Sequence, residues 1–172
     1  MKARRAYLGL GSNLGDRGKN LRLALTKLAQ VPEIKIIRCS SFYETEPVEA
    51  MGGWFLNAAV ALETALDPIY LWRRLQALEE EIGRPRERGQ GAPRIIDLDV
   101  LLYEDWIYED PELTIPHSAM HKRRFVLEPL REIAPGAWHP LLGRTIEELL
   151  QELEDAHRVI QLASEKGLGG QR

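Results

Sequence analysis

The chain has 172 residues, 44% of them hydrophobic, which is enough for one domain with one core. A net charge of −3 argues against non-specific binding to nucleic acid or to a membrane surface, so an anion site must come from locally clustered arginines. The single cysteine, Cys39, excludes an internal disulfide, and no Cys or His pair has zinc-ligand spacing. No targeting or membrane-spanning segment is evident, and we expect a cytoplasmic chain.

Apolar patterns predict six elements in the order strand, helix, strand, strand, helix, strand. The predicted strands are residues 6–10, 34–42, 54–63 and 96–103, and the predicted helices are residues 21–31 and 68–82. Asp67 and Pro68 are typical of a helix start, and Gly83 of a helix end. This order is that of an α+β, ferredoxin-like βαββαβ sandwich. Both helices should cover one sheet face and leave the other face free for a ligand.

The third predicted strand has two different faces. Leu56, Ala58, Val60 and Leu62 form the expected core face, and Phe55 and Asn57 lie on the opposite face.

The sequence GLGSNLGD, which begins at the end of the first strand, only partly matches phosphate-binding loops. Its glycines at 9, 11 and 15 are spaced one residue too widely for the dinucleotide fingerprint, and the P-loop pattern is also incomplete. We interpret the segment as a tight structural turn, with Asn13 or Asp16 capping the next helix.

The C-terminal third is expected to add helices to the sandwich. A loop and short helix are predicted within LTIPHSAMHKRRFVLEPL, and an amphipathic helix from about Thr145. Residues 1–164 are expected to form one domain, and residues 165–172 a flexible tail.

Asp97 and Asp99 are two residues apart on the fourth predicted strand, so both carboxylates point to one side, about 7 Å apart at Cβ. That arrangement suits two metal ions roughly 3.5–4 Å apart, bridged by phosphates. Carboxylate ligands without thiolates favour Mg²⁺. The alternative is that both aspartates form salt bridges with Arg94 and its neighbours.

Arginines are concentrated just before the two aspartates. They are Arg84, Arg86, Arg88 and Arg94, interspersed with glycines. Guanidinium groups bind phosphate oxygens bidentately. A cationic loop beside two carboxylates therefore favours nucleotide triphosphate chemistry, although a solvated charged face is the common alternative.

Five segments together resemble the 6-hydroxymethyl-7,8-dihydropterin pyrophosphokinase family of the folate pathway. In chain order they are YLGLGSNLGDR, SSFYETEPV, FLNAAVALET, APRIIDLDVLLY and LTIPHSAMHKRRFVLEPLREIAP. The resemblance runs from about Tyr7 to Pro140. It implies a ferredoxin-like α+β sandwich and transfer of the β,γ-pyrophosphoryl group of ATP to the pterin hydroxymethyl oxygen, giving AMP.

The resemblance also implies which residues form the site. Asp97 and Asp99 would bind two Mg²⁺ ions, and the further catalytic residues would be Arg84, Arg86 and Arg94. The expected ATP-binding residues are Gln76, Glu79, Val100, Thr114, His117 and Arg123. The expected pterin-binding residues are Thr45, Val48, Phe55, Asn57 and Phe125. In this arrangement the two phenylalanines stack on the pterin ring, and the asparagine hydrogen-bonds its edge.

The expected partners are ATP and the pterin, without nucleic acid or membrane, and the chain is expected to act as a monomer. Two other classes of protein are alternatives. An NAD-dependent oxidoreductase would use the first glycine-rich turn, but its glycine spacing is wrong. A ferredoxin-like nucleotide-binding or regulatory module without catalysis would carry the arginines as a solvated loop. Mg²⁺-dependent nucleotide binding separates these possibilities, because the module needs neither metal nor ATP.

Overall fold

The computed structural model describes residues 2–47, 52–83 and 95–166. The predicted site residues Val48, Arg84, Arg86 and Arg94 lie outside the described residues.

A six-stranded antiparallel sheet forms the centre of the fold. Its strands are β1 (Arg4–Ser12), β2 (Ile34–Cys39), β3 (Ser41–Thr45), β4 (Phe55–Thr64), β5 (Asp97–Tyr103) and β10 (Val159–Lys166). The α-helices of the described chain are α1 (Arg17–Ala29), α2 (Pro68–Ile82), α3 (Arg124–Ile133) and α4 (Ile146–Glu152). The remaining elements are β6 (Tyr108–Asp110), β7 (Leu113–Ile115), the 3₁₀ helix η1 (Met120–Lys122), β8 (Trp138–His139) and β9 (Arg144–Thr145).

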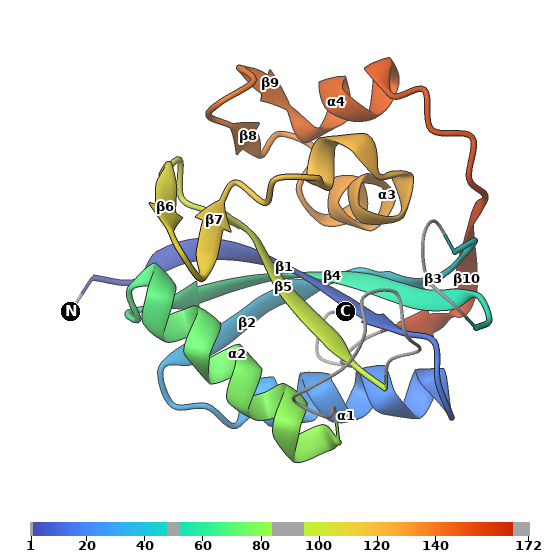
Figure 1. Cartoon of the computed structure of the whole chain (residues 1–172), viewed down its shortest axis with the longest axis horizontal. Helices are drawn as coiled ribbons and strands as arrows, with labels where there is room; N and C mark the ends of the chain where they lie inside the picture. The colour runs from blue at the N-terminus through green and yellow to red at the C-terminus, as the bar shows by residue number, and fades with distance from the viewer. Residues whose placement is uncertain (1, 48–51, 84–94, 167–172) are drawn as a thin grey trace.

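The sheet order is β10-β3-β4-β1-β5, and β2 also pairs with β4. The sheet separates two helical layers (Figure 1), with α1 and α2 below it and α3 and α4 above it in that view. No helix of the described residues is long and apolar enough to cross a membrane.

The helix-start and helix-stop signals in the sequence are confirmed. Asp16, rather than Asn13, caps α1: its side chain accepts a hydrogen bond from the Lys19 N–H at 3.1 Å. Pro68 stands in the first turn of α2, and Gly83 ends that helix with a φ of 125°, a value that only glycine adopts readily.

The predicted core face of β4 is confirmed. Leu56, Ala58, Val60 and Leu62 are each at most 3% exposed and belong to the cluster that includes α1 and α2. Burying a large aliphatic side chain contributes about 1.5–3 kcal/mol, so this layer provides much of the stability of the fold.

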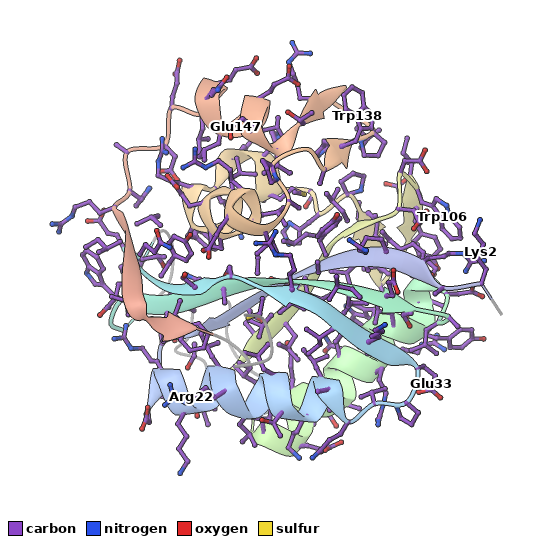
Figure 2. The ribbon with its side chains drawn as sticks, turned by 180° about the vertical axis from the view of Figure 1, so that it is seen from behind. Lys2, Arg22, Glu33, Trp106, Trp138 and Glu147 are labelled. Carbon is purple, nitrogen blue, oxygen red and sulfur yellow. The ribbon has the colours of Figure 1, made fainter. Side chains whose placement is uncertain are left out.

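The prediction that the opposite sheet face is free holds only in part, because α3 covers some of it. Ala59, Ala61 and Leu101 lie on it and are buried in one cluster with Leu127 and Leu130 of α3. Figure 2, the view from behind, shows side chains filling the space between the sheet and each helical layer. The small side chains of β4 explain this packing, because a helix can approach a sheet closely over alanine.

Two predicted strand boundaries are wrong. The first strand continues past Leu10 to Ser12, so Gly11 is a strand residue like Gly9, and only Gly15, with a φ of 72°, lies in the turn. Residues 34–42 form parts of two strands, because Ser40 interrupts them: its Oγ accepts the Ala59 N–H at 2.9 Å and shifts the pairing with β4 by one residue.

β10 is a strand that the sequence pattern does not indicate. It pairs antiparallel with β3, from Val159 opposite Thr45 to Lys166 opposite Ser41. This strand continues to Lys166, so it includes residues 165 and 166 of the predicted tail.

Candidate active site

Two rows of residues cross the centre of the sheet on the face that α3 partly covers. In the first row, Gly11 of β1 lies opposite Asn57 of β4 and Asp97 of β5. In the second row, Gly9 lies opposite Ala59 and Asp99. The strand register therefore places the asparagine and both aspartates on either side of a strip of glycine backbone.

The absence of a side chain at Gly11 is required by its neighbours. A Cβ at this position would lie 2.6 Å from Asn57 Oδ1 and 3.5 Å from Phe55 Cδ2. The first distance is a clash, so the side chains of β4 extend over β1 only because the residue there is glycine. The sequence interpretation missed this role by assigning Gly11 to a turn. Two glycines at alternate positions of an apolar strand were the available signal.

Asn57 is held in a fixed orientation. It is 6% exposed, and its Nδ2 donates a hydrogen bond of 2.5 Å to Oγ1 of the buried Thr45. Thr45 was expected to contribute a backbone group to the site; the structure shows that its side chain orients the asparagine. With the amide nitrogen engaged, the orientation of the amide oxygen over Gly11 is fixed as well.

Asp97 and Asp99 lie on the same face of β5, as their spacing predicts. Both are half-buried, while Leu98 between them is 1% exposed and faces the α1/α2 layer. No group of three or more His, Cys, Asp or Glu residues in the described chain could hold a metal ion. The two carboxylates can therefore bind a hard cation only with further oxygens from water or substrate, which is how Mg²⁺ is commonly bound.

His117 is attached to β5 at a β-bulge and interacts electrostatically with Asp97. Tyr7 pairs with Leu102 and Leu8 with Val100, so the pairing of β1 with β5 skips Leu101. The carbonyl of Leu101 accepts the His117 N–H at 2.9 Å. His117 Nδ1 in turn accepts the Ala119 N–H at 3.2 Å, which leaves the proton of the neutral ring on Nε2.

Two other predicted site residues, Arg123 and Asp97, affect the pKa of His117. Burial and the charge of Arg123 lower the pKa of His117 below its usual value, and Asp97 partly opposes this shift. His117 is therefore neutral near pH 7.

We expect the protein to become less stable as the pH falls from about 7.5 to 5.5. Burial lowers the pKa of His117, His121 and His139, assisted by neighbouring positive charge. The unfolded chain therefore binds more protons in this range, so the stability is complete above about pH 6.5 and is lost as the pH falls through the folded-state pKa values. Melting temperatures measured across this pH range test whether stability falls with pH as expected.

His117→Asn is the matched variant for this experiment, because its Oδ1 can accept the Ala119 N–H but does not titrate. It should flatten the pH dependence of melting. An unchanged slope would contradict a contribution from His117.

The first residues of α3 are held at a defined place above the sheet. The Arg123 guanidinium lies 5.6 Å from the centre of the Phe125 ring. Asp155 Oδ2 accepts the Arg124 N–H at 3.0 Å. Burial of Asp155 opposes its ionisation, but hydrogen bonds from Arg124 and His157 outweigh it and lower the pKa of this carboxyl group. The helix therefore begins at a fixed anionic anchor.

The far end of α3 is anchored by Glu132. Its carboxylate accepts hydrogen bonds from the Ser41 N–H and Oγ, both at 3.0 Å, and from the Tyr43 hydroxyl at 2.6 Å. Burial, together with Glu132, strongly raises the pKa of Tyr43. Because both ends of α3 are fixed, Phe125 has little freedom to move relative to β3 and β4.

The remaining predicted ATP residues lie on other elements. Gln76 is half-buried on α2, Thr114 is exposed on β7, and the Val100 side chain lies in the core. Glu79 is 1% exposed, and its Oε2 accepts the Leu98 N–H at 2.6 Å. The structure thus brings together Asp97, Asp99, Phe55, Asn57 and His117 on one face, but it places Glu79 beneath β5.

A separate cavity of about 620 Å³ lies beside the start of α3. Arg123 lines it, but Asp97 and Asp99 do not. Two of its basic side chains contact its own acids: Arg144 pairs with Glu152 at 3.3 Å, and the His157 ring contacts Asp155. The candidate site is therefore assigned to the sheet face, where the aspartates lie.

Comparison with known sequences identifies a family. The family model described as 7,8-dihydro-6-hydroxymethylpterin-pyrophosphokinase matches residues 7–135. A 2-amino-4-hydroxy-6-hydroxymethyldihydropteridine pyrophosphokinase of Methylorubrum extorquens is 45% identical over 151 residues, covering 87% of this chain and 94% of that protein. A protein of the same name from Haemophilus influenzae is 40% identical, covering 91% and 97% of the two chains.

Other relatives are much longer. The folic acid synthesis protein fol1 of Schizosaccharomyces pombe is 42% identical over 149 residues, which cover 86% of this chain but only 20% of that protein. The crystal structure of wild-type Plasmodium falciparum HPPK-DHPS with pteroate matches with a TM-score of 0.72 and 16% identity, covering 88% of this chain and 44% of that one. This likeness shows the fold.

The family match covers β1 to α3 and includes Asn57, both aspartates, His117 and Phe125. The resemblance seen in the sequence is thereby confirmed. The chain belongs to the 7,8-dihydro-6-hydroxymethylpterin-pyrophosphokinase family, whose members are ATP-dependent diphosphotransferases.

Proposed function

We propose that this chain transfers the β,γ-pyrophosphoryl group of ATP to the hydroxymethyl oxygen of 6-hydroxymethyl-7,8-dihydropterin, giving AMP and the pterin diphosphate. The observation that carries the proposal is the row Asn57–Gly11–Asp97. It places a fixed amide, suited to the edge of a heterocycle, across one glycine strand from a carboxylate pair suited to a metal-bound phosphate chain. Membership of the family supports the same reaction.

Asp97 and Asp99 fit magnesium by their chemistry. They offer hard oxygen ligands on one face, and the described chain supplies no third ligand, so phosphate oxygens and water would complete the coordination. We propose two Mg²⁺ ions held by this pair. When bound, they neutralise charge on the phosphates and align them for in-line attack.

The pterin would bind over the glycine strip. Phe55 and Phe125 would stack on its two faces, and Asn57, oriented by Thr45, would hydrogen-bond its edge. Neither phenylalanine belongs to the two buried clusters of the described chain, so both retain surface for a ligand. Val48 would add a backbone contact.

The nucleotide would lie on the other side of the aspartates. His117 and Arg123 would face the phosphates: the neutral His117 can donate through Nε2, and Arg123 supplies a positive charge. β5 is an edge strand, as a backbone contact from Val100 to adenine requires. Gln76 and Thr114 would contribute at the rim, and Arg84, Arg86 and Arg94 would contact the transferring group.

The chain's own groups would act mainly by alignment and charge neutralisation, because the loose transition state of phosphoryl-type transfer needs little general-base help. Asp97 is the only candidate for accepting the hydroxyl proton.

We also propose that the βαββαβ portion of the sheet and α1/α2 layer is ferredoxin-like, with α3 and α4 as helical additions. Strands β5, β1, β4 and β2 are neighbours in the order that this fold requires. Residues 1–164 would act as one pyrophosphokinase domain, as a cytoplasmic monomer.

The direct test is to incubate the purified chain with ATP, Mg²⁺ and 6-hydroxymethyl-7,8-dihydropterin and to measure AMP and pterin diphosphate by chromatography. Equal amounts of the two products are expected, only when all three components are present. ADP in place of AMP would indicate transfer of a single phosphoryl group. No nucleotide turnover, with ATP still bound, would support the non-catalytic module instead.

A further inference from the structure

Glu79 is a deeply buried acidic residue near the site, and the proposed chemistry gives it no contact to substrate. It lies near the end of α2, is 1% exposed, and accepts the Leu98 N–H at 2.6 Å through Oε2. Leu98 is the residue between Asp97 and Asp99. A carboxylate in the protein interior is costly unless it is hydrogen-bonded, and a short bond to a backbone N–H is among the strong kinds.

The direction of this hydrogen bond determines which edge of β5 it can hold in place. Successive backbone groups of a strand point to opposite edges, so the Leu98 N–H that binds Glu79 points away from β1. The backbone groups of Asp97 and Asp99 face β1, opposite Gly11 and Gly9. Since β5 is the last strand in the sheet order, no further strand fixes its outer edge at Leu98 within the described sheet.

We propose that Glu79 is a positioning residue for the aspartate pair rather than a contact to ATP. It fixes the segment 97–99 from the outer edge, and β1 fixes it from the inner edge. The two carboxylates are then held on one face with a constant spacing. This inference rests on the proposed binding of Mg²⁺ by Asp97 and Asp99.

Loss of the carboxylate should therefore affect metal binding before nucleotide recognition. Residues that hold metal ligands from outside the coordination shell typically change metal affinity about 10- to 100-fold when they are replaced. An ATP contact predicts a different result: a higher KM for ATP with an unchanged requirement for Mg²⁺.

Three variants separate a positioning role of Glu79 from a contact to ATP. Glu79→Leu removes the hydrogen-bond acceptor and puts an apolar side chain of similar size in its place. Glu79→Gln keeps an amide oxygen that can accept the Leu98 N–H. Thr64→Val is the control, because Thr64 Oγ1 also accepts a backbone N–H, from Leu66 at 3.0 Å, but at the opposite end of β4 from Asn57.

Two measurements do not depend on turnover. Amide hydrogen exchange of Leu98 in the ligand-free protein, followed by NMR, reports the hydrogen bond itself. Calorimetric titration of Mg²⁺ into protein saturated with α,β-methylene-ATP reports metal affinity. In Glu79→Leu, both the Leu98 exchange rate and the Mg²⁺ dissociation constant should rise about 10- to 100-fold. Glu79→Gln should remain within about threefold of wild type, and Thr64→Val should change neither.

The inference is overturned if Glu79→Leu binds Mg²⁺ as wild type does, or if it weakens only the binding of the ATP analogue. Should Glu79→Leu fail to fold, Glu79→Gln remains the deciding variant. If Glu79→Gln keeps the hydrogen bond but binds Mg²⁺ more than about tenfold more weakly, the charge of Glu79 itself contacts the ligand, and the inference is overturned. If wild type forms no AMP, the proposed function fails, but the exchange and calorimetric results still decide the role of Glu79.

Discussion

AMP formation should fall by about 10³-fold or more when Asp97 or Asp99 is replaced by asparagine. Each replacement would remove one anionic ligand from the proposed metal-binding pair, for which the described residues supply no third protein ligand. Charge stabilisation by bound metal is worth several kcal/mol in such reactions, and each 1.4 kcal/mol corresponds to a factor of about ten in rate. Asparagine has the same shape, so the core formed by Leu98 and Val100 should be retained.

Asp105→Asn is the matched control, because this exposed aspartate lies just beyond β5, in a turn. It should leave AMP formation unchanged. Rates are measured over a range of Mg²⁺ concentrations, together with melting temperatures. Normal turnover by Asp97→Asn and Asp99→Asn, accompanied by a lower melting temperature, would show that the aspartates serve as salt-bridge partners of the preceding arginines.

Local signals in the sequence were sufficient for the elements that are determined by local chemistry. The helix α2 was predicted at both ends because proline and glycine restrict the backbone directly. The core face of β4 followed from alternation alone. Boundaries that depend on tertiary contacts were not predictable in this way: Ser40 interrupts its strand through a hydrogen bond with Ala59, a residue 19 positions away.

The edge strand β10 was missed for a related reason. Ile160 is 48% exposed and Leu162 is only partly buried, so the strand lacks a continuous buried face that a pattern could reveal. Its pairing with β3 is a long-range contact that composition does not encode.

Within the site, the sequence indicated which residue types matter but not how they are arranged. The shared face of Asp97 and Asp99 followed from their spacing. That Asn57 lies across from them depends on β1 lying between β4 and β5. That Gly11 must be glycine depends on where the Asn57 side chain extends. The resemblance assigned Glu79 to ATP, whereas its hydrogen bond to Leu98 is visible only in three dimensions.

The three phenylalanines of the chain provide an internal test of the pterin site. Phe42 is completely buried in the main cluster, whereas Phe55 and Phe125 are half-buried and belong to neither cluster. Phe42→Ala should destabilise the fold by about 3–5 kcal/mol through lost burial and a cavity. Phe55→Ala and Phe125→Ala should cost less than about 1 kcal/mol of stability, because much of each ring already faces outward in the free protein.

Pterin affinity should show the opposite order. Each site phenylalanine would contribute stacking of about 0.5–1.5 kcal/mol beyond area burial, and about 1–1.5 kcal/mol for the covered ring face. Phe55→Ala and Phe125→Ala should therefore weaken pterin binding about 10- to 150-fold, with ATP binding nearly unchanged. Phe42→Ala, measured below its melting temperature, should retain pterin affinity.

Asn57 tests the polar half of the same pocket. Asn57→Leu should weaken pterin binding by about 1–3 kcal/mol, because the ring edge would lose its hydrogen-bond partner once binding has removed it from water. Thr45→Val leaves the amide present but removes the acceptor that orients it, so a smaller loss in the same direction is expected. Melting temperatures, together with calorimetric pterin titration in the presence of α,β-methylene-ATP, decide whether these residues bind the pterin or pack the fold. A large loss of stability with unchanged pterin affinity would assign Phe55, Phe125 and Asn57 to the packing of α3 on the sheet.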